Sequence, residues 1–211
     1  MGLNLSRWKI SKFVYAASSS CYGKASTPTS ENHLINPLYP YALSKYQGEQ
    51  LSFHWNKVYR LPVNSIRIFN AYGLRVKTTG VYGAAFGVFL KQKLKNKPFT
   101  VVGNGNQKRD FIYVEDAIQA MVLAGTKRDK FVSGVYNIGT GHATSLRQMI
   151  RNIKAAGVEV KVAYTPKARV RQNSFSLDAS RFRKCFGWKP KVLPSVGIKN
   201  TLLWFQKKAT L

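Results

Sequence analysis

Stretches of apolar residues alternate with amphipathic segments along most of the chain, and this pattern predicts its secondary structure. Residues 12–18 (KFVYAAS) are an apolar run rich in β-forming residues, which is typical of a buried parallel strand, and residues 63–69 (VNSIRIF) are predicted to form a second strand. A helix is predicted between them, at residues 41–59. The same pattern predicts further strands at residues 99–102, 110–114, 135–138 and 158–164.

Helices are predicted in the gaps between these strands. One covers residues 81–95 and ends in a basic cluster, and another covers residues 115–126 and has acidic residues in its first turn, where the helix dipole favours them. Ser145 is placed to cap a third helix, and Asp178 and Ser195 are placed to cap the last two. Strands that alternate with helices in this way favour an α/β fold with a parallel sheet.

The balance of charge is unusual for a chain of 211 residues. Its 34 Lys and Arg residues outnumber its 8 Asp and Glu residues, which gives a formal net charge of +26. Such a surface attracts polyanions: RNA, DNA, anionic lipid or phosphorylated ligands. Because the charges are spread along the whole chain, a solvated basic surface without a fixed partner stays an open alternative.

Other features of the composition argue against several classes of protein. Cys21 and Cys185 form no CxxC pair and the histidines show no ligand spacing, so we expect no metal site. The longest apolar stretch, near residues 81–90, is about half of the ~20 residues that a membrane span needs, so we expect no span. No signal peptide is visible, and we expect the protein in the cytoplasm, with an organellar matrix as the alternative.

The segment Tyr41-Ala-Leu-Ser-Lys45 contains the first candidate for chemistry. Positions i and i+4 share one face of a helix, so the phenol and the ammonium project into the same space. A free phenol has a pKa of about 10, and a nearby fixed cation lowers that pKa because it favours the phenolate. Tyr41 is therefore a candidate general base and acid for a substrate hydroxyl. The same spacing also occurs by chance on ordinary helices, so the segment needs a context.

Three other segments supply that context. The first predicted strand ends in Ser18-Ser-Ser-Cys-Tyr-Gly23, and its hydroxyls therefore stand at the strand end where α/β folds place their sites. Asn70 supplies an amide beside a turn. Arg109 stands at the start of a strand, and its guanidinium suits a diphosphate. The alternative interpretation of Arg109 and Asp110 is an ordinary surface ion pair.

Five motifs follow one another along the chain: SSSxYG, YPYALSK, RIFNAYG, GNGxxxRDFIYVEDA and YNIGTG. In this order and spacing they resemble the extended short-chain dehydrogenases that modify nucleotide sugars. This is the NAD-dependent epimerase/dehydratase family, which includes the UDP-sugar 4-epimerases. The resemblance extends over residues 12–204.

The resemblance implies a role for individual residues. It makes Tyr41 the catalytic base and acid and Ser18 the hydroxyl that hydrogen-bonds the reacting oxygen of the sugar. It makes Lys45 the cation that lowers the pKa of Tyr41 and holds the nicotinamide ribose, so that Tyr41, Lys45 and Phe69 are the implied contacts to NAD. The implied contacts to the nucleotide sugar, which we expect to be UDP-linked, are Ser20, Asn70, Thr100, Arg109 and Arg169. The family's phosphate-binding arginine aligns with Ala168, and Arg169 stands one position further on.

The resemblance also favours one reaction. Family members that dehydrate or decarboxylate the sugar usually have a Glu two residues before the Tyr of the SSSxYG motif, where this chain has Ser20. No carboxylate is then available there to move a second proton, and we expect 4-epimerisation by oxidation and re-reduction at C4 of the sugar. A 4-reductase uses the same three catalytic residues and remains an alternative.

The resemblance implies a truncated Rossmann-like parallel sheet, with its C-terminal strands only, plus a small α/β substrate-binding lobe. Residues 1–73 would form the catalytic portion of the NAD-binding domain. Residues 74–211 would form mainly the sugar-binding lobe, with sheet-completing segments interleaved. No glycine-rich GxGxxG motif stands before residue 12. We therefore expect little NAD affinity from this chain alone, an exposed edge on strand 12–18, and a partner chain as one source of the remaining strands.

Three functions stay open at this stage. The chain is a UDP-sugar 4-epimerase or its catalytic part, which the Ser18, Tyr41 and Lys45 set favours. Alternatively, it is a basic epimerase scaffold recruited as a non-catalytic RNA-binding or assembly subunit, for example in an organellar ribosome, which the charge of +26 favours. The third hypothesis is an inactive remnant, in which the loss of acidic residues marks decay.

Overall fold

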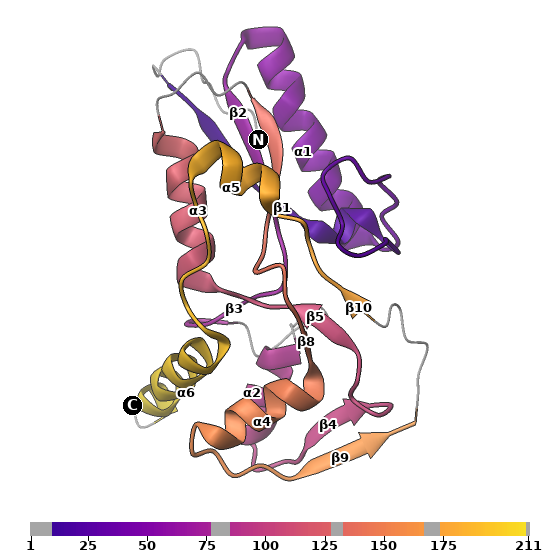
Figure 1. Ribbon diagram of the computed structural model, residues 1–211, viewed down its shortest axis with the longest axis vertical. Helices are drawn as coiled ribbons and strands as arrows, with labels where there is room; N and C mark the ends of the chain where they lie inside the picture. The colour runs from indigo at the N-terminus through magenta and orange to yellow at the C-terminus, as the bar shows by residue number, and fades with distance from the viewer. Residues whose placement is uncertain (1–9, 77–84, 128–132, 167–173, 210–211) are drawn as a thin grey trace.

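The computed structural model describes residues 10–76, 85–127, 133–166 and 174–209, and Figure 1 shows it as two groups of elements along one axis. The upper group contains a three-stranded parallel sheet in the order β1-β2-β7. These strands are β1 (Phe13–Ser18), β2 (Val63–Ile68) and β7 (Gly134–Ile138). Helix α1 (Pro40–Tyr59) covers one face, and α3 (Val114–Thr126) and α5 (Ser180–Phe186) cover the other.

Strand β2 lies in the centre of this sheet and is buried on both faces. Because side chains alternate along a strand, Ser65 and Arg67 face α1, where both donate hydrogen bonds to Glu49. Asn64 faces the opposite way and donates from Nδ2 to the Ala124 carbonyl of α3 at 2.9 Å. Each of these buried polar side chains therefore has a partner on the helix that it faces.

The lower group is a lobe with its own aromatic and aliphatic core. It contains α2 (Ala85–Leu94), β4 (Phe99–Val102), α4 (Leu146–Ala155), β9 (Val162–Thr165) and α6 (Pro194–Ala209), with β4 and β9 paired in parallel. The Phe89 and Phe99 rings stack at 4.6 Å between centroids. Further fully buried side chains of this core are Phe86, Val101, Met149 and Ile153.

Short strands connect the two groups. β3 (Ala71–Tyr72) pairs in parallel with β6 (Ile112–Tyr113), directly after β2 and directly before α3. A second small sheet has the order β10-β5-β8, made of β10 (Ser174–Phe175), β5 (Lys108–Asp110) and β8 (Ala143–Ser145). Segments far apart in the sequence thus meet between the sheet and the lobe.

The predicted α/β fold with a parallel sheet is confirmed, and most predicted elements lie within a few residues of their expected positions. Ser145 caps α4 as predicted, because its hydroxyl accepts a hydrogen bond from the Gln148 amide at 3.1 Å. The N-cap of α5 is Ala179 rather than the predicted Asp178, which stands one residue earlier and whose carboxylate accepts from the Ser180 amide at 2.8 Å. The prediction for Ser195 is wrong, because α6 begins one residue earlier, at Pro194.

Two predicted strands differ from the structure. The single strand predicted at 110–114 is two strands, β5 and β6, with Phe111 between them, because each pairs with a different neighbour. The strand predicted at 158–164 begins only at Val162, which pairs with Phe99, the first residue of β4. Alternating apolar residues give no information about where the partner strand begins.

Within the described residues, β1 pairs with β2 alone, which places it at one edge of the sheet. In the same part of the chain, no helix has the length and apolar character needed to cross a membrane. No group of His, Cys, Asp and Glu side chains suited to a metal ion occurs among those residues. The division into domains at residue 73 stays a prediction.

Candidate active site

The loop that follows β1 holds a hydroxyl group at the carboxyl end of the sheet. Ser18 is the last residue of β1 and the N-cap of the short 3₁₀ helix η2 (Ser19–Tyr22). Its Oγ accepts a hydrogen bond from the Ser20 amide at 3.2 Å and lies 2.8 Å from Ser20 Oγ. A hydroxyl both donates and accepts, so Ser18 is held in place while it can still meet a ligand.

Helix α1 begins next to this loop. Pro40 is its first residue, a position that suits proline because no hydrogen bond is lost there. Tyr41 follows; its side chain is 37% exposed and its ring stacks on that of Tyr39 at 6.5 Å. Lys45 lies one turn further along, half-buried, and its Nζ donates to the Ala16 carbonyl of β1 at 3.0 Å.

This contact sets how α1 lies against β1. Because α1 connects two parallel strands, it runs in the opposite direction to β1. Tyr41 stands about 6 Å from Lys45 along the helix axis, and Ser18 stands about 6.6 Å from Ala16 along the strand. Both steps lead in the same direction, so Tyr41 and Ser18 reach a similar level at the carboxyl end of β1.

A buried ion pair fixes the loop and the helix to the sheet. Arg67 Nη2 lies 2.6 Å from Glu49 Oε1, and Arg67 Nε donates to Glu49 Oε2 at 3.0 Å. Burial alone would lower the pKa of the guanidinium, but the hydrogen bonds to Glu49 and the neighbouring acidic groups outweigh it and raise that pKa. Arg67 Nη1 also donates to Tyr22 Oη at 2.8 Å, and Tyr22 Oη donates to Asn137 Oδ1 at 2.7 Å. This network joins α1, β2, η2 and β7 directly beneath the candidate site.

Arg109, on β5, approaches the same region from the lobe. The side chain is half-buried, and burial lowers the pKa of its guanidinium while the neighbouring Tyr39 phenol opposes that shift. Tyr39 is the N-cap of α1 and stacks on Tyr41. Asn70 follows β2 and donates from Nδ2 to the Asp110 carbonyl at 3.3 Å. Arg109 and Asn70 are therefore brought toward the start of α1.

The interpretation of Arg109 and Asp110 as a surface ion pair is wrong for Asp110, which is fully buried. Its carboxylate accepts hydrogen bonds from the Thr140 amide and hydroxyl, at 2.9 and 2.6 Å, and from the Gly141 amide at 2.9 Å. A Cβ on Gly139 would lie 2.7 Å from Asp110 Oδ2. Burial raises the pKa of this carboxyl, and these hydrogen bonds oppose the shift.

The roles of Asp110 and of the buried ion pair are not apparent from the sequence. The YNIGTG motif could have indicated the buried position of Asp110, because small residues in a turn leave room for a buried carboxylate. Its Gly139, Thr140 and Gly141 surround the carboxylate of the GNGxxxRDFIYVEDA motif. These two motifs are therefore one structural unit, which ties β5 to the turn after β7.

The other predicted site residues lie in different surroundings. Ser20 is part of the β1 loop described above. Phe69 is 4% exposed and packs edge-on against Phe175 at 4.5 Å, so little of its side chain is open to a cofactor. Thr100 is on β4 in the lobe, where its hydroxyl accepts from Gln92 Nε2 at 2.9 Å. Arg169 lies outside the described residues.

Comparison with known proteins identifies a family with the same sequence pattern. The family described as "NAD dependent epimerase/dehydratase family" matches residues 4–139. A putative UDP-glucose 4-epimerase from Methanocaldococcus jannaschii is 34% identical over 203 residues, which cover 95% of this chain and 65% of that protein. This chain therefore spans just under two thirds of the length of that relative.

Solved structures with the same fold are similar over nearly the whole chain. The UDP-glucose 4-epimerase of Thermotoga maritima, solved with UDP-glucose, superposes with a TM-score of 0.86 at 28% identity. The matched region covers 97% of this chain and 66% of the Thermotoga chain. The UDP-glucuronic acid 4-epimerase of Bacillus cereus, solved with UDP-glucuronic acid and NAD, has the same TM-score and identity. The matched region covers 97% of this chain and 64% of the Bacillus chain. The α/β fold is thus that of Rossmann-like sugar-nucleotide epimerases.

Proposed function

Because the chain belongs to the NAD dependent epimerase/dehydratase family, we propose that it carries the catalytic and sugar-binding part of a nucleotide-sugar 4-epimerase. The observation that carries this proposal is the contact between Lys45 Nζ and the Ala16 carbonyl. This contact fixes one face of α1 against β1, two residues before Ser18, with Tyr41 one turn closer to the end of the sheet. A phenol, an ammonium and a hydroxyl then lie within reach of one sugar ring.

In the proposed reaction Tyr41 takes the proton of the sugar 4-hydroxyl and later returns it. The Ser18 hydroxyl donates a hydrogen bond to the same oxygen and orients it. Lys45 shares the helical face of Tyr41, and two of its three N–H donors remain for ligand hydroxyls after the bond to Ala16. Inversion at C4 follows when the flat 4-keto sugar turns over before it is reduced on its other face.

The described residues fit the nicotinamide end of NAD, which when bound supplies hydride acceptance and return at C4. Tyr41 is exposed at the carboxyl end of the sheet, and the Lys45 ammonium beside it has donors suited to ribose hydroxyls. No described parallel strand leads at once into a glycine-rich turn and a helix, the usual cradle for a pyrophosphate. The adenosine half of the cofactor would therefore need residues outside the described part of the chain.

Asn70 and Arg109 are the proposed contacts to the diphosphate of a UDP-sugar. Both lie on the lobe side of the candidate site, and Arg109 is half-buried next to Tyr39. A guanidinium presents its N–H groups in a fixed fork that matches phosphate oxygens, and this geometry supports the assignment. The two solved structures described above contain UDP-glucose and UDP-glucuronic acid, and these are the substrates to test first.

The test is to incubate the full gene product that contains this chain with NAD and each UDP-sugar and to follow the sugar by NMR. An epimerase gives a mixture of the two C4 epimers from either direction, with no net use of cofactor. A 4-reductase needs a reduced cofactor and a 4-keto sugar and therefore gives no turnover in this mixture, whereas a dehydratase releases water and leaves a deoxy keto sugar. A deoxy keto sugar, or no turnover, contradicts the proposed epimerase.

A further inference from the structure

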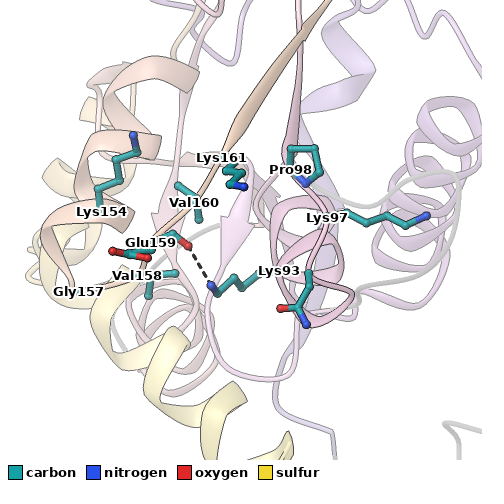
Figure 2. Close-up of a pocket in the computed structure, with 10 residues that line it drawn as sticks. Lys93, Lys97, Pro98, Lys154, Gly157, Val158, Glu159, Val160 and Lys161 are labelled. Carbon is teal, nitrogen blue, oxygen red and sulfur yellow. Dashed lines mark hydrogen bonds between the residues drawn. The ribbon is translucent and has the colours of Figure 1, made fainter.

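We propose that a basic groove at the end of the molecule away from α1 binds the phosphodiester backbone of a nucleic acid. The groove is a cavity of about 650 Å³ between the ends of α2 and α4 and the starts of β4 and β9 (Figure 2). Four lysines line it, Lys93, Lys97, Lys154 and Lys161, and Glu159 is the only acidic residue in its lining. The proposal is independent of the proposed epimerase activity.

The four lysines come from three segments that are distant in the sequence. Lys93 and Lys97 lie at the end of α2 and just after it, Lys154 is in the last turn of α4, and Lys161 precedes β9. Figure 2 shows Lys97 and Lys154 on opposite sides of the groove, with Lys93 extending toward the Glu159 carbonyl between them. Lys93 Nζ donates to that carbonyl at 2.9 Å, which leaves two of its donors for a ligand.

Helix capping explains part of this arrangement, but not all of it. A cation in the last turn of a helix is favoured by about 0.3–1 kcal/mol through the helix dipole, which accounts for Lys93 and Lys154. Lys97 and Lys161 lie outside the helices, and the dipole does not account for them. The fold itself does not require these two charges at the rim of the groove.

The positions of the acidic residues indicate that the cationic surface is a selected feature and not the result of random loss of acids. The structure describes seven of the eight, since Asp129 lies outside the described residues. Five of the seven accept internal hydrogen bonds, namely Glu31, Glu49, Asp110, Asp116 and Asp178. Of the other two, Glu115 lies in the first turn of α3, where the helix dipole favours an acid. Six of the seven thus stand where the fold uses them, and the seventh, Glu159, is exposed in the lining of the groove.

A nucleic acid matches this surface better than a protein partner does. Lysine is depleted at protein–protein interfaces, whose centres are apolar and aromatic, whereas interfaces with nucleic acids are strongly positive. Apart from the lysines, the groove is lined mainly by Asn96, Pro98, Gly157, Val158 and Val160, which include no aromatic anchor. A lysine ammonium binds phosphate as a point charge, which suits a backbone contacted without regard to base sequence.

The test compares two variants of equal net charge. In the groove variant Lys93, Lys97, Lys154 and Lys161 are changed to Gln, and in the control variant Lys24, Lys57, Lys184 and Lys189, which are exposed and remote from the groove, are changed to Gln. Binding of labelled single-stranded RNA and of duplex DNA is measured by fluorescence anisotropy over a range of salt concentrations. Thermal melting confirms that both variants are folded.

We expect the groove variant to bind at least about tenfold more weakly than the control variant at physiological salt. The slope of log affinity against log salt should be smaller for the groove variant than for the control variant by up to about 3. Each of the four lysines that contacts a phosphate on a single strand contributes about 0.7 to that slope. The difference between the RNA and DNA arms identifies which nucleic acid is the source of the phosphates. Equal loss in the two variants, no binding by the unmodified protein, or equally tight binding of a poly-glutamate peptide would overturn the proposal.

Discussion

Gly48 of α1 lies directly against the side chain of Tyr15 on β1. A Cβ at this position would lie 2.1 Å from the Tyr15 hydroxyl oxygen and 2.7 Å from Tyr15 Cζ. The burial of Tyr15 raises the pKa of its phenol, so this tyrosine is neutral and packs as part of the sheet. Lys45, which contacts β1 at Ala16, precedes Gly48 by three residues. Side-chain size at one position therefore sets the distance between the helix and the strand that carry the candidate site.

Replacing Gly48 with Ala should destabilise the protein by about 1–3 kcal/mol, because an added methyl group overpacks this contact. At an open position of a helix the same change stabilises by about 1 kcal/mol. Urea denaturation of Gly48→Ala, of Tyr15→Phe and of the double variant measures the coupling. The double variant should recover part of the loss, since the nearest clashing atom is gone. A stabilised Gly48→Ala protein would show that α1 does not pack as described.

Cys21 is a buried thiol, and its reactivity reports on the loop beneath the candidate site. The side chain is 2% exposed, and burial raises its pKa from 9.0 to about 12. At pH 8 only about 1 thiol in 10⁴ is then ionised, and only the thiolate reacts with electrophiles. We expect iodoacetamide to label native protein far faster at Cys185 than at Cys21. The rate at Cys21 should rise about tenfold per pH unit up to pH 10 without levelling off.

The variant Cys185→Ser isolates the signal of Cys21, and urea-unfolded protein gives the rate of an unprotected thiol. Labelling of Cys21 in native protein at the unfolded rate would contradict the buried position of this loop.

At the scale of elements, α1 is attached to the sheet mainly by polar contacts. The side chains of α1 that are buried are those of Ala42, Glu49 and Ser52, and the ion pair of Glu49 with Arg67 is 1% and 5% exposed. Charges buried this deeply need excellent pairing, because their desolvation costs several kcal/mol. The position of Tyr41 and Lys45 therefore depends on the ion pair beneath them.

Arg67→Met should destabilise the protein by about 3–5 kcal/mol, because it leaves Glu49 buried without its cation. Replacing both partners, as Arg67→Met with Glu49→Leu, should cost less than Arg67→Met alone, since no unpaired charge remains. Arg183→Met, at an exposed position on α5, is the matched control and should change stability by less than about 0.5 kcal/mol. Denaturant titration measures all three, and a double variant less stable than the single one contradicts this account.

The elements themselves follow well from the sequence. Strand β2 and helix α1 begin at the residue predicted for each or one residue from it, although three of the six residues of β2 are polar and buried. The short strands β3, β8 and β10 were not predicted. Strands of two or three residues have too little periodicity, and their existence depends on distant partners.

The candidate site follows from the sequence only in part. The spacing of Tyr41 and Lys45 sets them on one helical face, but the Ala16 carbonyl that receives Lys45 is a backbone atom with no sequence signal. Arg67 and Glu49 are 18 positions apart and look like surface charges until the fold buries them. Asp110 is similar, because its partners are backbone amides of a turn 30 residues away.

At the scale of the whole molecule, charge is the dominant feature. Among the described residues, Arg67 and Glu49 form a buried ion pair. Most of the other Lys and Arg side chains lie on the surface without a neighbouring acid, and they account for the net charge of +26. Self-repulsion of like charges destabilises a compact state, and salt screens it. The fold must therefore be stable in spite of its surface.

We expect the melting temperature to rise when sodium chloride is increased from about 0.02 M to about 0.5 M, because screening shortens the reach of the repulsion. Differential scanning fluorimetry measures this shift, and potassium chloride should act in the same way because the effect does not depend on the cation. A melting temperature that falls with salt would mean that the lysines and arginines form more favourable pairs than the structure describes.

The proton transfer assigned to Tyr41 is the central claim, and its most direct test is the rate of C4 inversion in a pair of matched variants. Tyr41→Phe and Tyr59→Phe each remove one hydroxyl from α1, the second at the far, exposed end of the helix. With NAD and a UDP-sugar, Tyr41→Phe should slow the full gene product by about 10²–10⁴-fold, the usual contribution of a general acid–base group, whereas Tyr59→Phe should keep the original rate. Equal rates for the two variants would contradict the account.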